Sequence, residues 1–459
     1  MAFVLFALVG LGIGLRLWLA VTDDGIYWPD EIHQSLEPAH RWLFGYGLIA
    51  NEFYLGARNW AFPGFTALVL RACSWVSDAP RRYIEGVRVS FALVAALAIW
   101  GCHRLARALG ANAAGSALAA ILFALAPPAI YFAPRALSDT ASATLVVWGF
   151  ALALEAVGSR PRSKNTSLLV LGVSLVGLAV LFRLQNGLFA VGLVVLLVPR
   201  RKDALVAFGV LCVWAVAYGA LDRITWGSWY HSVLPYVRLQ DQARLYGVAP
   251  FTYYAQVVWR AMPLIVLVAL PLAVFANAPV LMFIVVADLV AMSLVAHKEL
   301  RFIFALLPLW FVLAGVGYTR IAAKPWLFVA GAMLALVSGL RFHQLTFPEL
   351  GLYEDKPPVT AFDGFGDVNR LLLAAHDRAD LCGLKLDAAR LAWSGGATYL
   401  HRDVPIYARD DAASAGHYNY VIAVGGVAGG EIVARDGRTV LARVAASCTP
   451  DSSYNWALH

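Results

Sequence analysis

Two adjacent carboxylates follow the first strongly apolar stretch of the chain. The run from Phe3 to Val21 is long enough to cross a bilayer, and Asp30 and Glu31 lie shortly after it. Ionisable side chains near lipid are costly to place, so they are functional candidates by default. A carboxylate can take the proton from a hydroxyl that attacks the anomeric carbon of a sugar, which makes Asp30 and Glu31 candidates for catalysis. The alternative is that Asp30 caps a helix predicted over 32–44.

A second polar cluster lies between two apolar runs that leave almost no room for a loop. It reads His297-Lys298-Glu299-Leu300-Arg301. Basic groups at the bilayer edge could hold a phosphate or pyrophosphate through charge-assisted hydrogen bonds. The plainer alternative is a turn whose long basic side chains reach the interface and pair with the glutamate. We favour the phosphate site, because four polar residues exceed what such a turn needs.

Further charged and aromatic side chains lie at the ends of predicted spans. Arg183 and Arg135 could add to an anion site, although a single arginine there is more often an interfacial anchor. Asp139 could equally be a favourable charge at a helix N-terminus. Aromatic side chains in the loop after position 222 either stack on sugar or form part of a membrane belt. The candidate substrate contacts are His33, Gln34, Asp139, Trp229 and Tyr230.

The composition is that of a membrane protein. Of the 459 residues, 60% are hydrophobic and 14% are charged, whereas soluble domains carry roughly 25% charged residues. We expect about eleven membrane spans of roughly 20 residues each. They are predicted to begin near Ala2, Val87, Ala113, Leu137, Ser167, Gly187, Ala204, Val257, Pro279, Arg301 and Pro325. The net charge of +7 is assigned to cytoplasmic loops and lipid contact rather than to nucleic-acid binding.

Positive charge indicates which loops face the cytoplasm. If the N-terminus is inside and residues 60–76 are an interfacial or re-entrant segment, the basic loops all fall on the inner side. These loops hold Arg104, Arg107, Arg160, Arg162, Lys164, Arg200, Arg201, Lys202, Arg320 and Lys324. The same topology puts the polar clusters on the outer side. We therefore expect Asp30, Lys298 and Arg301 to share a cavity at the outer surface.

The composition changes after about position 342, where hydrophobic runs shorten and turn residues appear. We expect a transmembrane domain over 1–341, with a first outer loop at 22–86, and a small mixed α/β domain outside the membrane over 342–459. A helix is predicted over 367–380 and short strands over 391–393, 404–407, 420–424 and 440–444. Cys382 and Cys448 could pair if this region is extracytoplasmic. No CxxC spacing occurs, so no metal site is expected.

The amino-acid sequences of these clusters resemble the motifs of glycosyltransferase family 22. Its members are the dolichyl-phosphate-mannose-dependent mannosyltransferases of asparagine-linked glycan and GPI-anchor assembly, with bacterial relatives. WPDEIHQSLEPAH at 28–40 is similar to the family loop HPDE-x-x-Q-S-x-E-x-x-H, and HKELRFIFALLPL at 297–309 to its HKE-x-RF signature. RALSDT at 135–140 and DRITWGSWY at 222–230 resemble further family segments in the same order.

The resemblance implies an all-α membrane protein of the GT-C fold, a sugar donor carried on a lipid phosphate, inversion at the anomeric carbon and no cofactor or metal. By the family pattern Asp30 is the base, Glu31 is its partner, and His297, Lys298 and Arg301 hold the donor phosphate. Two positions depart from the pattern. Trp28 replaces a family histidine, so any role of that histidine does not carry over, and Leu184-Gln185 after Arg183 replaces a Pro-Thr-like pair.

The expected reaction is transfer of mannose, or a similar hexose, from polyprenyl phosphate to a lipid-linked or cell-envelope glycan. We expect a bacterial inner membrane, with the active site and the C-terminal domain on the periplasmic side. One alternative is a transporter or flippase for a lipid-linked sugar, which would need polar residues deep within spans; Asp288 is the one clear mid-span acid in the sequence. The other is a GT-C enzyme with a different donor sugar or acceptor.

Overall fold

The chain packs as two compact units, each built from two separate stretches of sequence. The computed structural model describes residues 2–158, 165–242, 244, 247–321, 324–352, 359–409, 411 and 414–457. The first unit, here called the helical unit, comprises Met1–Ala20 and Phe91–Thr360. The second, here called the mixed unit, comprises Val21–Ser90 and Ala361–His459. The mixed unit therefore combines the predicted first outer loop with most of the predicted C-terminal domain.

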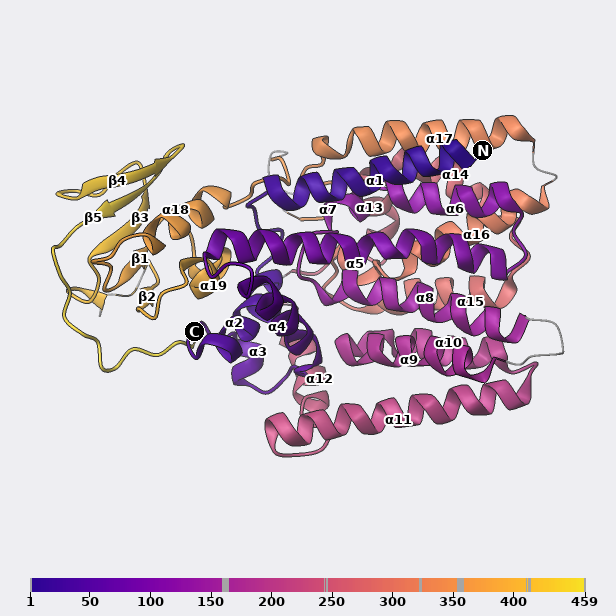
Figure 1. Cartoon of the computed structure of the whole chain (residues 1–459), viewed down its shortest axis with the longest axis horizontal. Helices are drawn as coiled ribbons and strands as arrows, with labels where there is room; N and C mark the ends of the chain where they lie inside the picture. The colour runs from indigo at the N-terminus through magenta and orange to yellow at the C-terminus, as the bar shows by residue number, and fades with distance from the viewer. Residues whose placement is uncertain are drawn as a thin grey trace. The chain divides into compact units, whose positions relative to one another are not determined.

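The helical unit is a set of apolar helices, most of which run roughly parallel in Figure 1. Helices α1 (Ala2–Thr22) and α5 (Pro80–Ala108) contribute residues to both units. The other helices of this unit are α6 (Ala113–Leu125), α7 (Pro127–Tyr131), α8 (Ser138–Gly158), α9 (Thr166–Phe182), η2 (Leu184–Asn186), α10 (Gly187–Leu197), α11 (Arg201–Trp226), α12 (Val233–Gln242), α13 (Tyr253–Ala261), α14 (Pro263–Val274), α15 (Pro279–Leu294), η4 (Leu300–Ile303), α16 (Leu306–Arg320), α17 (Pro325–Leu340) and η5 (Phe342–Gln344). The predicted inner-loop residues Arg160, Arg162 and Lys164 lie outside the described residues.

Several of these helices have the length and composition of membrane spans. Among the described residues four do so alone, namely α1, α5, α8 and α11, and counting the bent pair α13 and α14 as one broken span gives up to five. The remaining predicted spans contain apolar helices of 10–17 residues. The segment predicted to be interfacial forms α4 (Ala61–Ser74), which is shorter than a span and packs on α2 in the mixed unit. The chain is a mostly helical, multi-pass membrane protein.

Three predicted spans begin differently from expectation, and proline explains one of them. The helix expected near Val87, α5, already begins at Pro80. The span expected near Val257 is broken into α13 and α14, which meet at an angle of 119°. Pro263 has no backbone N–H and disfavours helical geometry in the residue before it, so Met262 leaves the helix. The span expected from Arg301 starts only at Leu306, after the short 3-10 turn η4.

Glycine lets two central helices of the helical unit approach closely. Gly115 of α6 faces Gly315 of α16, and a Cβ atom on either one would overlap the backbone carbonyl of the other. Small residues at such contacts are typical of helix pairs in membranes, where packing rather than the hydrophobic effect drives association. The C-terminal end of α6 is capped by Arg16 of α1. This arginine is fully buried and donates hydrogen bonds to the carbonyl oxygens of Phe123 and Ala124 at 3.0 and 2.5 Å. These carbonyls have no partner within their own helix, so an intramembrane arginine satisfies them.

The mixed unit contains one five-stranded sheet and a group of short helices. Its strands are β1 (Leu384–Leu386), β2 (Ile406–Tyr407), β3 (Tyr420–Val424), β4 (Glu431–Asp436) and β5 (Thr439–Arg443), in the order β2-β1-β3-β5-β4. β1 pairs in parallel with β2 and β3, whereas β5 is antiparallel to β3 and β4. The helices are η1 (Ile32–Leu36), α2 (Glu37–Phe44), α3 (Asn51–Tyr54), α4, α18 (Gly366–His376), η6 (Leu391–Trp393) and α19 (Gly396–Leu400). Helix α18 packs on β3, β4 and β5.

Buried polar contacts join the two stretches of the mixed unit. Glu37 is fully buried, and its carboxylate accepts hydrogen bonds from the backbone N–H of Leu48 at 2.6 Å and from the N–H and hydroxyl of Thr398 at 2.6 and 2.7 Å. His40 contacts His401 at 2.9 Å between ring nitrogens. Within the C-terminal stretch, a disulfide joins Cys382 and Cys448. The first outer loop is therefore part of the core of this unit rather than a free connection.

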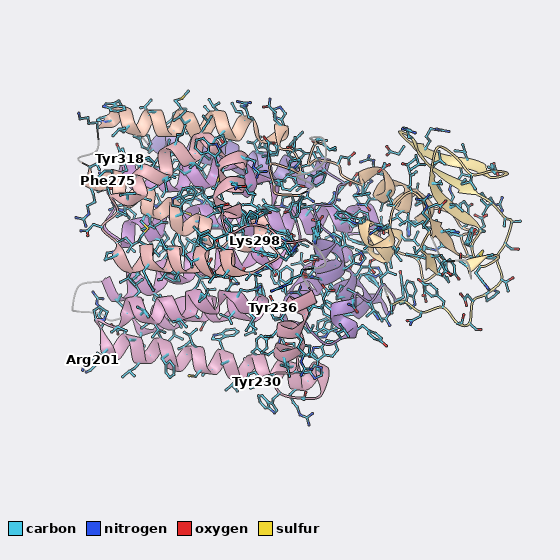
Figure 2. The ribbon with its side chains drawn as sticks, turned by 180° about the vertical axis from the view of Figure 1, so that it is seen from behind. Arg201, Tyr230, Tyr236, Phe275, Lys298 and Tyr318 are labelled. Carbon is cyan, nitrogen blue, oxygen red and sulfur yellow. A yellow bond between two sulfur atoms is a disulfide. The ribbon has the colours of Figure 1, made fainter. Side chains whose placement is uncertain are left out.

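The two ends of the helical unit differ in their side chains. Figure 2 places Arg201, Phe275 and Tyr318 at one end of the helices, and Tyr230, Tyr236 and Lys298 towards the other. Arg201 belongs to a predicted inner loop and Lys298 to a predicted outer loop. The separation agrees with the topology that charge predicts.

Candidate active site

The acidic pair lies at the start of a distorted helix in the mixed unit. Asp30 and Glu31 precede the π-helical turn η1, a rare geometry that is frequent at functional sites. Glu31 is 4% exposed, and its Oε1 atom accepts the backbone N–H of Tyr27 at 2.6 Å. Asp30 is half-buried. Glu31 thus fixes the turn that presents Asp30.

Two further predicted residues of this loop have protein partners. His33 is 4% exposed, and its Nε2 atom lies 3.2 Å from the carbonyl oxygen of Ala392. Burial lowers the pKa of His33 to about 4, against the opposing effects of that carbonyl and of the nearby Asp30. The ring is therefore neutral at pH 7. Gln34 donates from Nε2 to Oε1 of Glu52 at 2.7 Å.

The cationic turn forms a buried cluster in the helical unit. Arg301 donates from Nε and Nη2 to the two carboxylate oxygens of Glu299 at 2.6 and 3.0 Å. A second carboxylate, Asp139, forms ion pairs with Arg183 and, at 3.5 Å, with Arg301. His297 Nε2 lies 3.1 Å from Glu299 Oε1. Segments that begin α8, end α9 and precede α16 are thus brought together.

Charges within this cluster nearly cancel, and Lys298 adds a further positive charge. Burial would raise the pKa of Glu299, but Arg301 and His297 outweigh burial and lower it. Burial would lower the pKa of His297, but the hydrogen bond and charge of Glu299 raise it. Lys298 is 6% exposed and donates from Nζ to the carbonyl oxygen of Ala249 at 2.7 Å. The turn can therefore present positive charge to an anion while Glu299 stays ionised.

Aromatic rings pack on the guanidinium groups. Phe302 lies 4.9 Å from Arg183 and 5.1 Å from Arg301, measured from ring centroid to guanidinium carbon. Arg135 lies 4.3 Å from the ring of Tyr131. Such contacts favour cations in places that water reaches poorly. They hold the planar groups in fixed orientations.

The remaining predicted contacts lie elsewhere in the helical unit. Trp229 and Tyr230 are 53% and 45% exposed and pack against Gly219 near the end of α11. Asp222, which begins the family-like segment, is buried and accepts from the N–H and hydroxyl of Ser232 at 2.9 and 2.8 Å. A sugar-contacting role for the two aromatic residues stays a prediction.

Asp30 and Glu31 belong to the mixed unit, whereas His297, Lys298, Arg301, Arg183, Arg135 and Asp139 belong to the helical unit. A cavity shared by the two groups stays a prediction.

The structure adds two residues that were absent from the predicted site. Glu299 holds Arg301 and His297, and its position inside the polar motif was a usable signal. Tyr254 is 1% exposed on α13, and its hydroxyl has no partner among the described residues. In the sequence Tyr254 was one of several aromatic residues in a long loop.

Comparison with known proteins decides the family. A model of the Alg9-like mannosyltransferase family matches residues 8–354. The chain belongs to this family. GPI mannosyltransferase 3 of Yarrowia lipolytica is 27% identical over 411 residues, which cover 85% of this chain and 74% of that protein. Human GPI alpha-1,2-mannosyltransferase 3 is 27% identical over 355 residues, covering 72% of this chain and 61% of that protein. This Alg9-like protein is a membrane mannosyltransferase, as the motifs predicted.

Solved structures show the same fold at low sequence identity. ArnT from Cupriavidus metallidurans, bound to undecaprenyl phosphate, superposes with a TM-score of 0.64 at 16% identity. The match covers 97% of this chain and 100% of the ArnT chain. The oligosaccharyltransferase AglB of Archaeoglobus fulgidus gives a TM-score of 0.55 at 11% identity, covering 92% of this chain and 69% of its own. Both comparisons confirm the predicted GT-C architecture of this Alg9-like protein.

Proposed function

We propose that this chain transfers mannose from a polyprenyl-phosphate donor to a hydroxyl of a lipid-linked or cell-envelope glycan, at the extracytoplasmic face of a bacterial inner membrane. The observation that carries the proposal is the buried cluster of Arg183, Arg301 and Lys298 in a helical membrane unit. Arginine presents several donors in a plane that matches phosphate oxygens, and lysine adds a compact charge. A solved relative in fold, ArnT, carries undecaprenyl phosphate.

In the proposed reaction Asp30 acts as the base. The acceptor hydroxyl gives its proton to the Asp30 carboxylate while its oxygen forms a bond to the anomeric carbon. The bond from that carbon to the phosphate oxygen breaks, and polyprenyl phosphate leaves with the electron pair. The cationic cluster stabilises the charge that develops on the leaving phosphate. One displacement inverts the anomeric carbon, and no general acid is needed.

Supporting roles follow from the contacts described above. Glu31 fixes the turn of Asp30, and Glu299 and Asp139 orient the guanidinium groups. His297 and Arg135 are proposed as further contacts to the donor phosphate. The transporter alternative required a polar route past Asp288, which is 3% exposed on α15. Membership of a mannosyltransferase family favours transfer over transport.

Replacement of the base tests the proposal directly. Asp30→Asn keeps the shape of the side chain and removes the proton acceptor, so turnover with mannosyl-phosphoryl-polyprenol should fall on the order of 10²–10⁴-fold. Release of polyprenyl phosphate by purified protein in lipid nanodiscs measures turnover. Asp387→Asn, the same change at an exposed position of the mixed unit, should leave it unaltered. Full turnover by Asp30→Asn would show that Asp30 is not the base.

The acceptor is identified by a separate experiment. Mass spectrometry of envelope glycolipids from cells with and without the gene should show a product that differs by one hexose. A glycolipid profile that is unchanged would contradict the proposed acceptor class.

A further inference from the structure

Three aromatic side chains of the mixed unit gather beside the acidic pair. Trp28, two residues before Asp30, meets Trp393 edge to face with ring centroids 5.2 Å apart. Phe365 lies 5.1 Å from the same Trp393 ring. All three residues are half-buried, so each keeps some accessible surface. Trp28 stands where the family pattern has a histidine, and the other two lie beyond the matched residues 8–354.

The backbone fixes this aromatic group in place. Phe365 has a φ of +60°, a left-handed conformation that is strained for a residue with a bulky side chain. The N–H of Ile26 donates to the carbonyl oxygen of Gly364 at 2.8 Å, which ties the segment before Trp28 to the segment before Phe365. A Cβ atom on Gly25 would overlap Gly364, so this approach requires glycine. Strain held by such contacts is typical of functional sites.

His33 adds a polar group to the same place. Its Nε2 atom faces the carbonyl oxygen of Ala392, the residue before Trp393, so Nε2 carries the hydrogen and Nδ1 is left as an acceptor. Nδ1 is buried and has no hydrogen-bond partner among the described residues. A buried acceptor without a partner is costly, and such groups are rare in folded proteins. The side chain therefore fits a hydroxyl donor that binds here.

We propose that Trp28, Trp393, Phe365 and His33 form the subsite for the acceptor sugar, a neutral hexose at the end of the acceptor glycan. The apolar face of the pyranose packs on the open indole surface, and one hydroxyl donates to Nδ1 of His33. A neighbouring hydroxyl then meets Asp30, one helical turn from His33. This inference rests on the proposed function, because it assigns the acceptor side of the same reaction.

The charges of the site select against other ligands. Asp30 and Glu31 disfavour a phosphate, and Nδ1 of the neutral imidazole carries no hydrogen to donate to one. An acyl chain would cover the rings but leave Nδ1 without a donor. A hexose supplies both an apolar face and hydroxyl donors, so it matches every group present.

Binding of simple sugars tests the subsite without any transfer reaction. The full chain in lipid nanodiscs is titrated with methyl α-D-mannoside, methyl α-D-glucoside or methyl α-D-galactoside, and saturation-transfer NMR reports bound sugar. We expect at least one hexoside to bind the wild type. His33→Phe and Trp393→Ala should each weaken it about 5–100-fold, as expected for an unmet polar group or a lost packing surface. His33→Asn, which keeps an acceptor near Nδ1, and Trp393→Phe, which keeps a ring, should retain most of the binding.

A matched tryptophan serves as control. Trp42 of α2 is 63% exposed in the same unit, and Trp42→Ala should bind as the wild type does. Where transfer is measurable, His33→Phe should raise the acceptor KM and leave the donor KM unchanged. Equal binding by wild type, His33→Phe and Trp393→Ala, or no binding of any hexoside, would overturn the subsite.

These outcomes separate the inference from the proposed reaction. Suppose that the wild type binds a hexoside, that the variants do not, and that the protein does not use mannosyl-phosphoryl-polyprenol. This result would support the subsite and exclude the proposed donor. If the protein transfers mannose and the variants have the same acceptor KM as the wild type, the reaction would be supported and the subsite excluded.

Discussion

Arg301 illustrates why the residue type, and not the charge alone, matters in the cationic cluster. Its planar guanidinium donates to both oxygens of Glu299 and also pairs with Asp139. A lysine keeps the charge but cannot meet two carboxylates in one plane. The buried acids would then lack donors that they have in the native cluster.

We predict that Arg301→Lys lowers kcat/KM for mannosyl transfer by about 10–100-fold, the effect of losing a charge-assisted hydrogen bond. Arg104→Lys provides the control, because Arg104 is also paired with a glutamate, Glu155, but is largely exposed. Its transfer rate should match the wild type. Unaltered kinetics for Arg301→Lys would show that charge alone is sufficient at this position.

Buried histidines make the mixed unit sensitive to acid. Burial, and then the neighbouring His401, lower the pKa of His40 from its ordinary 6.5 to about 3. Burial and then His376 lower the pKa of His401 to about 4. An unfolded chain takes up protons on these rings near pH 6.5, whereas the folded chain does so only near pH 3–4. Their contribution to stability is therefore present above pH 6.5 and is lost as the pH falls towards 4.

We predict that thermal unfolding in detergent shows falling stability of the wild type between pH 6.5 and 4. In His40→Phe the slope should be shallower by up to about 1.4 kcal/mol per pH unit, the value for one proton. Glu37 acts in the opposite direction, because burial raises its pKa to about 7. Equal slopes for wild type and His40→Phe would show that His40 titrates normally in the folded chain.

At the scale of elements, the close contact of α6 with α16 depends on two glycine residues, each of which has only a hydrogen atom as its side chain. Gly115 and Gly315 face each other without room for side chains. We predict that Gly115→Ala forces the helices apart and costs about 1–3 kcal/mol, the usual range for overpacking. A lowered midpoint of thermal unfolding measures the loss.

Gly209→Ala on α11 is the matched control, because a Cβ atom there would meet nothing within 4 Å. It should leave the midpoint unchanged or raise it slightly, since alanine favours helix over glycine. A Gly115→Ala protein that melts like Gly209→Ala would contradict the packing argument.

Helices and strands were predictable where hydrophobic patterns were long. The apolar runs that became α1, α8 and α11 were found with their starts close to those observed. The strand predicted over 391–393 was wrong, because this short apolar run forms the 3-10 turn η6. Two strands were missed: β1 has only three residues, and β4 is an edge strand with no buried residue, so neither carries a clear alternation.

At the scale of the whole molecule, the mixed unit depends on contacts between distant stretches. Thr398 donates twice to Glu37, once from its backbone and once from its hydroxyl. We predict that Thr398→Val, which removes the hydroxyl, destabilises this unit by about 1–3 kcal/mol. Hydrogen exchange should quicken in α2 and α19 and stay unchanged in α6 and α16.

Thr225→Val on α11 removes a hydroxyl that bonds only to its own helix, at the carbonyl oxygen of Leu221. It should not alter exchange in the mixed unit. Faster exchange in α6 and α16 of Thr398→Val, equal to that in α2, would show that the two units unfold together.

The site was predictable only in part, and sequence distance explains the limit. Asp30, Lys298 and Arg301 lie in polar motifs that interrupt apolar runs, so their residue types drew attention. Trp393 and His401 lie in a stretch with no such contrast, more than 350 residues from Trp28 and His40. Their importance comes from their partners, which a single sequence does not reveal.

The discontinuity of the mixed unit has a consequence for biosynthesis. Its first stretch, up to Ser90, leaves the ribosome before the 270 residues of Phe91–Thr360 and before its own second half. At about 5–20 residues per second, that delay is roughly 15–50 s. During this time Asp24 and Glu37 lack Arg370 and Thr398, the partners that later cover them. This first stretch must remain hydrated, or be shielded by a chaperone, until translation is nearly finished.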